Sequence, residues 1–138
     1  EPKGEVAALP GRSWFDIACE TDDPNRTAFS EYHAASSPSG AFMIRKGRYK
    51  YIYYVGYEPE LFDLKDDPEE VVNLAGDRAY RHIIEEFEGH LCAICDPIKA
   101  NRQAKDDQNT LIEKFGGREI ALHSGTPGAT PVPGKGHE

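Results

Sequence analysis

The chain has 138 residues, of which 29% are charged, and its formal net charge is −8. This length suits one domain or a large part of one, and the acidic balance argues against a nucleic-acid-binding protein, which would carry a basic stripe. The sequence has no apolar run long enough to span a membrane and no signal-peptide pattern at its start, so we expect no membrane partner. Its three cysteines are an odd count, which disfavours a closed disulfide framework and favours a cytoplasmic location.

The first 25 residues read as a lead-in segment. Residues 1–10 show no clear period, and Ser13 could cap a short helical turn that starts at Trp14. Trp14 and Phe15 call for burial that so short a segment cannot supply by itself. We therefore expect this segment to pack on something larger.

Residues 26–64 predict a small antiparallel sheet. We expect four strands, at 26–32, 42–45, 49–55 and 60–64. Lys46-Gly47 and residues 56–59 supply the turns of two hairpins.

The longest of these strands has an apolar component on both faces. One face carries Tyr49, Tyr51, Tyr53 and Val55, and the other carries Lys50, Ile52 and Tyr54. Because neither face is purely polar, we expect a helix on one side and a different partner on the other. The uncovered, tyrosine-bearing face would be a docking surface.

Three helical segments are expected after the sheet. Asp67-Pro68 predicts a helix start, with Val71, Val72 and Leu74 packing a single turn on the sheet. Asp77 should cap a long amphipathic helix whose apolar residues recur every three or four positions: Tyr80, Ile83, Ile84, Phe87, Leu91 and Ile94.

Asp96-Pro97 should open the last of these helices, which runs to Phe115 and is stopped by Gly116-Gly117. Residues 118–138 then read as an irregular tail. The fold class is therefore α+β, with residues 26–117 as the main subdomain.

The cysteines invite a metal or redox interpretation at Cys92-x-x-Cys95. Cys19 and His90 are the nearby residues that could complete a metal site. A structural zinc site needs four ligands, and a thioredoxin-type pair needs a strand-to-helix junction, whereas these two residues end a predicted helix. We interpret Cys92 and Cys95 as small buried side chains.

His33 is the other candidate, because it follows a strand and precedes a loop of small residues, where functional side chains often lie. An exposed loop histidine is the alternative, and the residues alone leave both open. We expect the remaining histidines at the surface: His82, His90, His123 and His137.

Two charged clusters each have a functional and a structural interpretation. Asp63, Asp66 and Asp67 could hold a hard cation, but helix capping and turn formation explain them better. The basic residues Arg45, Lys46, Arg48 and Lys50 read as a solvated hairpin tip or as an anion-binding patch. No nucleophile, base and oxyanion set is recognisable, so the residues describe a non-catalytic module.

Several motifs resemble the C-terminal part of sulfatases, in the alkaline phosphatase superfamily. They are SEYH at 30–33, FMIRKGRYKY at 42–51 and LFDL-x-x-DP-x-E-x-x-NL at 61–74, supported by LPGRS at 9–13, FGGRE at 115–119 and TPVPG at 130–134. The resemblance is to the aryl- and choline-sulfatase and phosphonate monoester hydrolase group, and it implies a four-stranded sheet packed by a C-terminal helix.

The resemblance also implies a catalytic centre outside this chain. The family uses a formylglycine made within C/S-x-P/A-x-R and a divalent cation, calcium or similar, both in a larger N-terminal domain. Cys19, Cys92 and Cys95 all lack that motif, so no catalytic residue and no metal ligand is carried over.

The resemblance places His33, with Tyr32, near the leaving-group side of the substrate pocket. It implies the N-terminal catalytic domain as a partner, and contacts through the tail in a homo-oligomer. The alternative is a free-standing interaction module that binds a protein or small anion through its basic hairpin tip.

Overall fold

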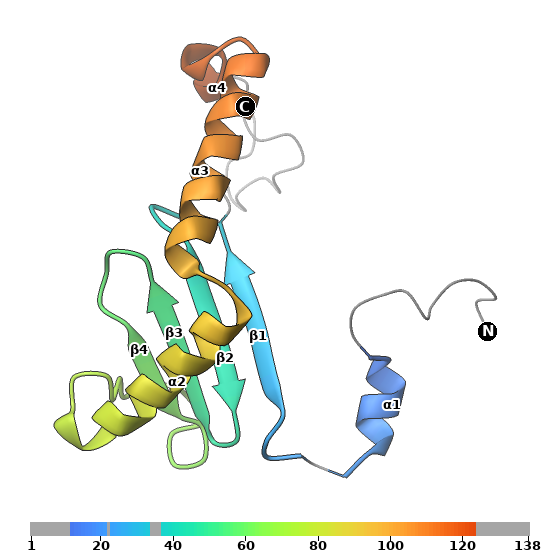
Figure 1. Ribbon diagram of the computed structural model, residues 1–138, viewed down its shortest axis with the longest axis vertical. Helices are drawn as coiled ribbons and strands as arrows, with labels where there is room; N and C mark the ends of the chain where they lie inside the picture. Colours follow the sequence, from blue (N-terminus) through green and yellow to red (C-terminus); the bar gives the residue numbers. More distant parts are fainter. Residues whose placement is uncertain (1–11, 22, 34–36, 124–138) are drawn as a thin grey trace, which may run out of the picture.

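The computed structural model describes residues 12–21, 23–33 and 37–123. Its centre is a four-stranded antiparallel sheet in the order β1-β2-β3-β4 (Figure 1). The strands are β1 Thr27–Tyr32, β2 Ala41–Lys46, β3 Tyr49–Tyr54 and β4 Glu60–Asp63. All four expected strands are thus present, and the α+β class is confirmed.

The register divides the sheet into two unlike faces. Phe29, Ile44, Tyr51 and Leu61 are cross-strand neighbours on one face, and Ile44, Tyr51 and Leu61 are fully buried. The opposite face carries residues such as Met43, Ile52 and Tyr54, which do not belong to the hydrophobic core.

Helix α2, Arg81–Ile94, covers the first of these faces (Figure 1). Ile83, Phe87 and Leu91 are its buried residues, as the spacing predicts. Burial of each side chain contributes about 1.5–3 kcal/mol to the free energy of unfolding, before the loss of conformational entropy is subtracted. Ile94 is 48% exposed, so the predicted stripe ends one turn early. The Tyr51 hydroxyl donates to Glu88 at 3.2 Å, and burial raises the pKa of this tyrosine.

The helical turn expected after Asp67 is wrong. Residues 71–74 are not helical, and Val71 and Val72 are 78% and 56% exposed. Glu70 has a φ of 55°, which breaks a right-handed path, and the Leu74 N–H donates to the Leu61 carbonyl at 2.8 Å. The segment therefore bonds to the edge of β4 instead of coiling.

A short 3-10 turn, Arg78–Tyr80, precedes α2, and Asp77 caps it through the Ala79 N–H. After α2, the Asp96 side chain accepts from the Lys99 N–H and opens α3, Pro97–Lys114, as expected. Gly116 and Gly117 both have positive φ and end this helix.

The segment after the two glycines differs from the irregular tail that we expected. Its first residues form α4, Arg118–His123, since the backbone can resume a right-handed path and the residues are good helix formers. The proline-rich end of the tail lies outside the described residues, as do residues 1–10 of the lead-in segment.

The two ends of the described chain make few contacts with the sheet. Helix α1, Trp14–Cys19, has no buried residue, and Trp14 and Phe15 are 89% and 85% exposed. Ser13 makes no side-chain cap, contrary to expectation. In Figure 1, α1 stands apart from the sheet and α3 projects beyond its end. No described helix is long and apolar enough to cross a bilayer.

Candidate functional site

His33 lies just beyond β1, one position past the last pair of the β1–β2 ladder, Tyr32 with Ala41. Its side chain is 21% exposed and packs edge-on against Phe42, with ring centroids 5.2 Å apart and planes at 78°. Because Phe42 is fully buried, the imidazole rests on the end of the hydrophobic core.

The two ring nitrogens of His33 have different surroundings. Nδ1 is buried and has no hydrogen-bond partner among the described residues. Nε2 lies 3.6 Å from a carboxylate oxygen of Glu31, which is too long for a hydrogen bond. Nε2 is therefore the nitrogen that remains able to meet a ligand.

Gly40 lets the imidazole take this position. A Cβ atom at Gly40 would lie 2.8 Å from His33 Cε1 and 2.9 Å from Nδ1, closer than real side chains approach. The absence of a side chain at Gly40 is thus part of the site.

Tyr32 is not brought together with His33 on one face. Strand alternation directs neighbouring side chains to opposite faces of the sheet, so Tyr32 belongs to the face without α2. Tyr32 is 52% exposed. The two residues can meet one ligand only where it passes the end of the sheet.

Helix α3 contacts the loop that follows His33 through two side-chain amides. The Gly40 N–H donates to Asn101 Oδ1 at 2.7 Å, and Gln108 Nε2 donates to the His33 carbonyl at 2.6 Å. We did not identify either residue from the sequence, because they lie in a helix whose middle is polar throughout and neither stands out.

The three aspartates serve the fold. Asp63 is 5% exposed and accepts from Arg48, which also bonds Asp66 at 2.5 Å. These hydrogen bonds hold the pKa of Asp63 below its usual range. Asp67 accepts from the Val72 N–H, so it closes a loop and is not the helix cap that we expected.

The basic residues of the hairpin tip do not form one patch. Arg48 is paired with Asp63 and Asp66, Lys50 with Glu70 at 2.5 Å, and Lys46 with Glu86 at 3.3 Å. Arg45 is exposed and has no ion-pair partner among the described residues. Three of the four cations are thus already neutralised by carboxylates.

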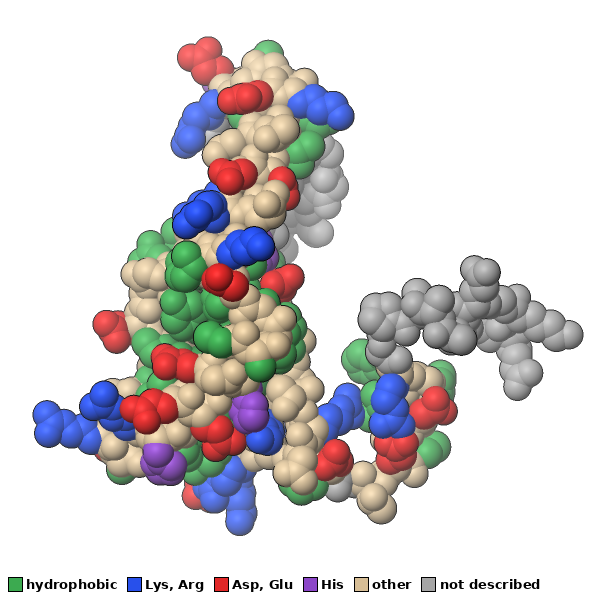
Figure 2. Space-filling view, viewed as in Figure 1, with side chains coloured by type: hydrophobic (Ala, Val, Ile, Leu, Met, Phe, Trp, Pro, Cys, Tyr) green, Lys and Arg blue, Asp and Glu red, His purple; other side chains and the backbone are tan. Residues whose placement is uncertain are grey.

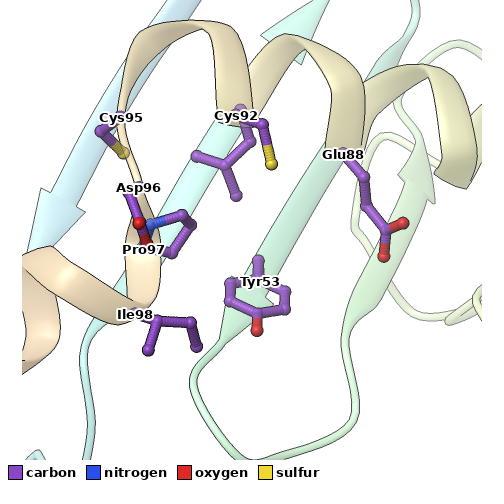
Figure 3. Close-up of a pocket in the computed structure, with 8 residues that line it drawn as sticks. Tyr53, Glu88, Cys92, Cys95, Asp96, Pro97 and Ile98 are labelled. Carbon is purple, nitrogen blue, oxygen red and sulfur yellow. The ribbon is translucent and has the colours of Figure 1, made fainter.

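A groove of about 500 Å³ lies where α2 meets α3, and hydrophobic side chains gather there in Figure 2. Figure 3 shows Cys92 and Cys95 at the end of α2 with Tyr53 of β3 below them. The expectation of buried cysteines is wrong for Cys92, which is exposed, while Cys95 is half-buried and burial raises the pKa of its thiol. Cys19 is exposed and lies in α1.

The groove does not assemble a metal site. Within the part of the chain that the structure describes, no group of three or more His, Cys, Asp or Glu residues could hold a metal ion. The other histidines differ in exposure: His82 and His123 are exposed, whereas His90 is half-buried beside Glu86 and Lys46. His137 lies outside the described residues.

Comparison with known families identifies the subdomain. A family model described as N-sulphoglucosamine sulphohydrolase, C-terminal, matches residues 6–96, which is more than half of the chain. The chain belongs to this family of sulfatase C-terminal domains. This confirms the resemblance noted from the motifs at 30–33, 42–51 and 61–74.

Curated relatives of this sulfatase domain are much longer proteins. A Delta 4,5-hexuronate-2-O-sulfatase of Bacteroides thetaiotaomicron is 40% identical over 83 residues, covering 59% of this chain and 16% of that protein. Arylsulfatase K of Mus musculus is 41% identical over 49 residues, covering 33% of this chain and 9% of that protein. The sulfatase domain thus spans less than a fifth of these relatives.

Solved structures also include similar chains. A putative sulfatase from Bacteroides thetaiotaomicron shares 32% identity with a TM-score of 0.46, covering 66% of this chain and 18% of that one. The phosphonate monoester hydrolase of Agrobacterium radiobacter shares 26% identity with a TM-score of 0.44, covering 49% of this chain and 16% of that one.

Proposed function

We propose that this chain is the C-terminal subdomain of a sulfatase-family hydrolase that cleaves sulfuric esters or phosphonate monoesters, and that it carries no catalytic centre of its own. The observation that supports this most is the family match to residues 6–96, in a chain that covers at most 16% of the two sulfatases named above. The subdomain would complete the fold of the catalytic domain and line its substrate cleft.

The chemistry of these residues agrees with a catalytic centre elsewhere. The divalent cation and the formylglycine that sulfatases use do not fit this chain, since no described cluster of ligands could hold a metal and none of the cysteines stands in C/S-x-P/A-x-R. In the catalytic domain, the formylglycine would supply the nucleophile, and the bound cation would stabilise charge on the ester.

Unpartnered surfaces support an N-terminal catalytic domain as the partner. The sheet face with Met43, Ile52 and Tyr54 lies outside the described core, and Trp14 and Phe15 of α1 are almost fully exposed. Large apolar side chains in this state mark an interaction surface. The catalytic domain would cover them.

At the cleft, His33 would border the leaving-group side of the substrate. Its buried Nδ1 and accessible Nε2 suit a fixed ring that presents one nitrogen to a ligand. Tyr32 would contribute from across the end of the sheet. Both are substrate-edge residues in this proposal, and neither performs chemistry.

The first test asks where catalysis resides. The purified 138-residue chain should hydrolyse neither 4-nitrophenyl sulfate nor a phosphonate monoester with any divalent metal added. Metal-dependent turnover by pure chain would contradict the proposal. Sequencing of the DNA upstream should reveal an in-frame C/S-x-P/A-x-R motif, whereas a start codon beside Glu1 would favour the free-standing module.

The second test concerns His33. In the full-length protein that contains this chain, His33→Ala should lower kcat/KM for 4-nitrophenyl sulfate by about tenfold, the loss of one hydrogen bond to substrate. Unchanged kcat/KM would remove His33 from the cleft while leaving the assignment of the subdomain intact.

A further inference from the structure

The second helix has an unusual relation to the sheet. Helix α3 has 18 residues, yet Pro97 is its one buried residue, and in Figure 1 most of its length projects past the sheet. Its hydrogen bonds to the sheet end come from Asn101 and Gln108. These two residues are seven positions apart, two helical turns, and therefore share one face.

That helix face is directed at the loop between β1 and β2. Ala104 and Lys105 lie between the two amides and, with His33, Ser39 and Gly40, line a small cavity of about 10 Å³, roughly the size of one water. Among the described residues the fit is close, so this helix face packs against the two ends of the loop at His33 and Gly40.

The side-chain amides of Asn101 and Gln108 form hydrogen bonds just beyond the end of the β1–β2 ladder. The β1–β2 ladder ends at Tyr32 and Ala41, and His33 and Gly40 are the next position on each strand. An amide oxygen of Asn101 meets the Gly40 N–H, and an amide nitrogen of Gln108 meets the His33 carbonyl. Each carboxamide thereby satisfies a backbone group that the ladder leaves without a strand partner.

We propose that Asn101 and Gln108 are positioning residues that fix the two ends of this loop, and through it the His33 imidazole, at the substrate cleft. The inference rests on the proposed function. We call the hydrogen bonds from Asn101 and Gln108 to the two ends of the loop the clamp. Without the clamp, the His33 ring would lose its support from Gly40 and sample other positions, so substrate binding would weaken while the chemical step stayed the same.

The clamp is tested first without any substrate, by hydrogen exchange of the Gly40 amide in the 138-residue chain. Asn101→Leu removes the acceptor at similar size and should speed exchange by about tenfold. Asn109→Leu is the matched control, because Asn109 lies on the same helix, is exposed, and its side chain has no hydrogen bond among the described residues.

Two charge-matched variants sharpen the test. Asn101→Asp keeps an oxygen for the Gly40 N–H, whereas Gln108→Glu replaces a donor by an oxygen that repels the His33 carbonyl. Both add one negative charge. We expect slow Gly40 exchange to survive in Asn101→Asp and a displaced His33 ring, seen by its NMR resonances, in Gln108→Glu.

The positioning role is tested in the full-length protein with 4-nitrophenyl sulfate. Asn101→Leu and Gln108→Glu should raise KM about three- to tenfold with kcat within about twofold of wild type. Asn101→Asp should restore most of the affinity. A fall in kcat without a change in KM would overturn the inference.

Three outcomes separate this inference from the proposed function. Equal Gly40 exchange in Asn101→Leu and Asn109→Leu overturns the clamp. Faster exchange with unchanged KM, while His33→Ala still lowers kcat/KM, overturns the positioning role and leaves the proposed function standing. No effect of His33→Ala overturns the role of His33 and, with it, this inference.

Discussion

At the scale of single residues, close approach and buried charge account for the site's local structure. His33 packs between Phe42 and Gly40. Asp63, at the end of the edge strand β4, accepts a hydrogen bond from Arg48. Both arrangements depend on one particular residue type: the first needs a residue without a side chain at position 40, and the second needs an ionised carboxylate.

Replacement of Gly40 by Ala should destabilise the chain by about 1–3 kcal/mol, because the new methyl group would overlap the His33 imidazole. The imidazole cannot move away, since it already packs against Phe42. Urea unfolding measures the change. Gly76→Ala is the control, since a methyl group added there would have nothing within 4 Å, and equal effects of the two variants would show that His33 does not occupy this niche.

The Asp63 carboxylate should make folding stability depend on acid pH. Hydrogen bonds from Arg48 lower its pKa in the folded state, so this stabilisation is present above the unfolded pKa of about 3.9 and is lost as pH falls through the lower folded value. Asp63→Asn should therefore be less stable than wild type at pH 7, and the difference should shrink below pH 4. A pH-independent difference would contradict this.

At the scale of elements, α2 is the part of the fold that its own spacing explains best. Its buried residues follow a three-and-four spacing, and the helix crosses the sheet on the face that carries Tyr51 and Ile44. Gly89 lies in this helix with nothing within 4 Å of the methyl position that Ala would fill.

Gly89→Ala should therefore stabilise the chain by about 1 kcal/mol, since Ala loses less backbone entropy in a helix and meets no neighbour here. Thermal unfolding followed by circular dichroism gives the comparison with wild type. A loss of stability would mean that another part of the chain approaches Gly89.

At the scale of the whole molecule, the two faces of the sheet differ: α2 packs on the face with Tyr51 and Ile44, whereas part of the opposite face is only half-buried by the residues that the structure describes. Ile52, Met43 and Tyr54 are half-buried outside the core, and α1 exposes Trp14. The catalytic domain that we propose as partner would remove this surface from water, so the cost of a charge on it should depend on whether that domain is present.

Ile52→Lys should cost about 1 kcal/mol or less in the 138-residue chain, but several-fold more in the full-length protein, where the lysine would be buried without a partner. Thermal unfolding of both proteins tests this. Val71→Lys, the same change at a side chain 78% exposed, controls for charge in the shorter chain. Equal costs in both proteins would place the docking surface elsewhere.

Local patterns in the sequence were sufficient for the sheet, for α2 and for the start of α3. Strand alternation, helical spacing and the Asp96-Pro97 cap act between residues close in the chain, so they can be recognised without coordinates. The predicted turn at Val71 and Val72 failed because an adjacent strand edge offered Leu74 a backbone partner, and no local propensity records that competition.

The surroundings of His33 were decided by tertiary structure. Asn101 lies 61 residues from Gly40, and Gln108 lies 75 residues from His33, so nothing nearby in the chain marks either amide as a partner. From the family motifs we expected His33 near a substrate, and that stays a prediction, whereas packing revealed which ring nitrogen is buried and which side chains bond to the ends of the loop. Hydrogen bonds between distant segments exist only after the sheet and α3 have come together, which is why the order of residues alone did not disclose them.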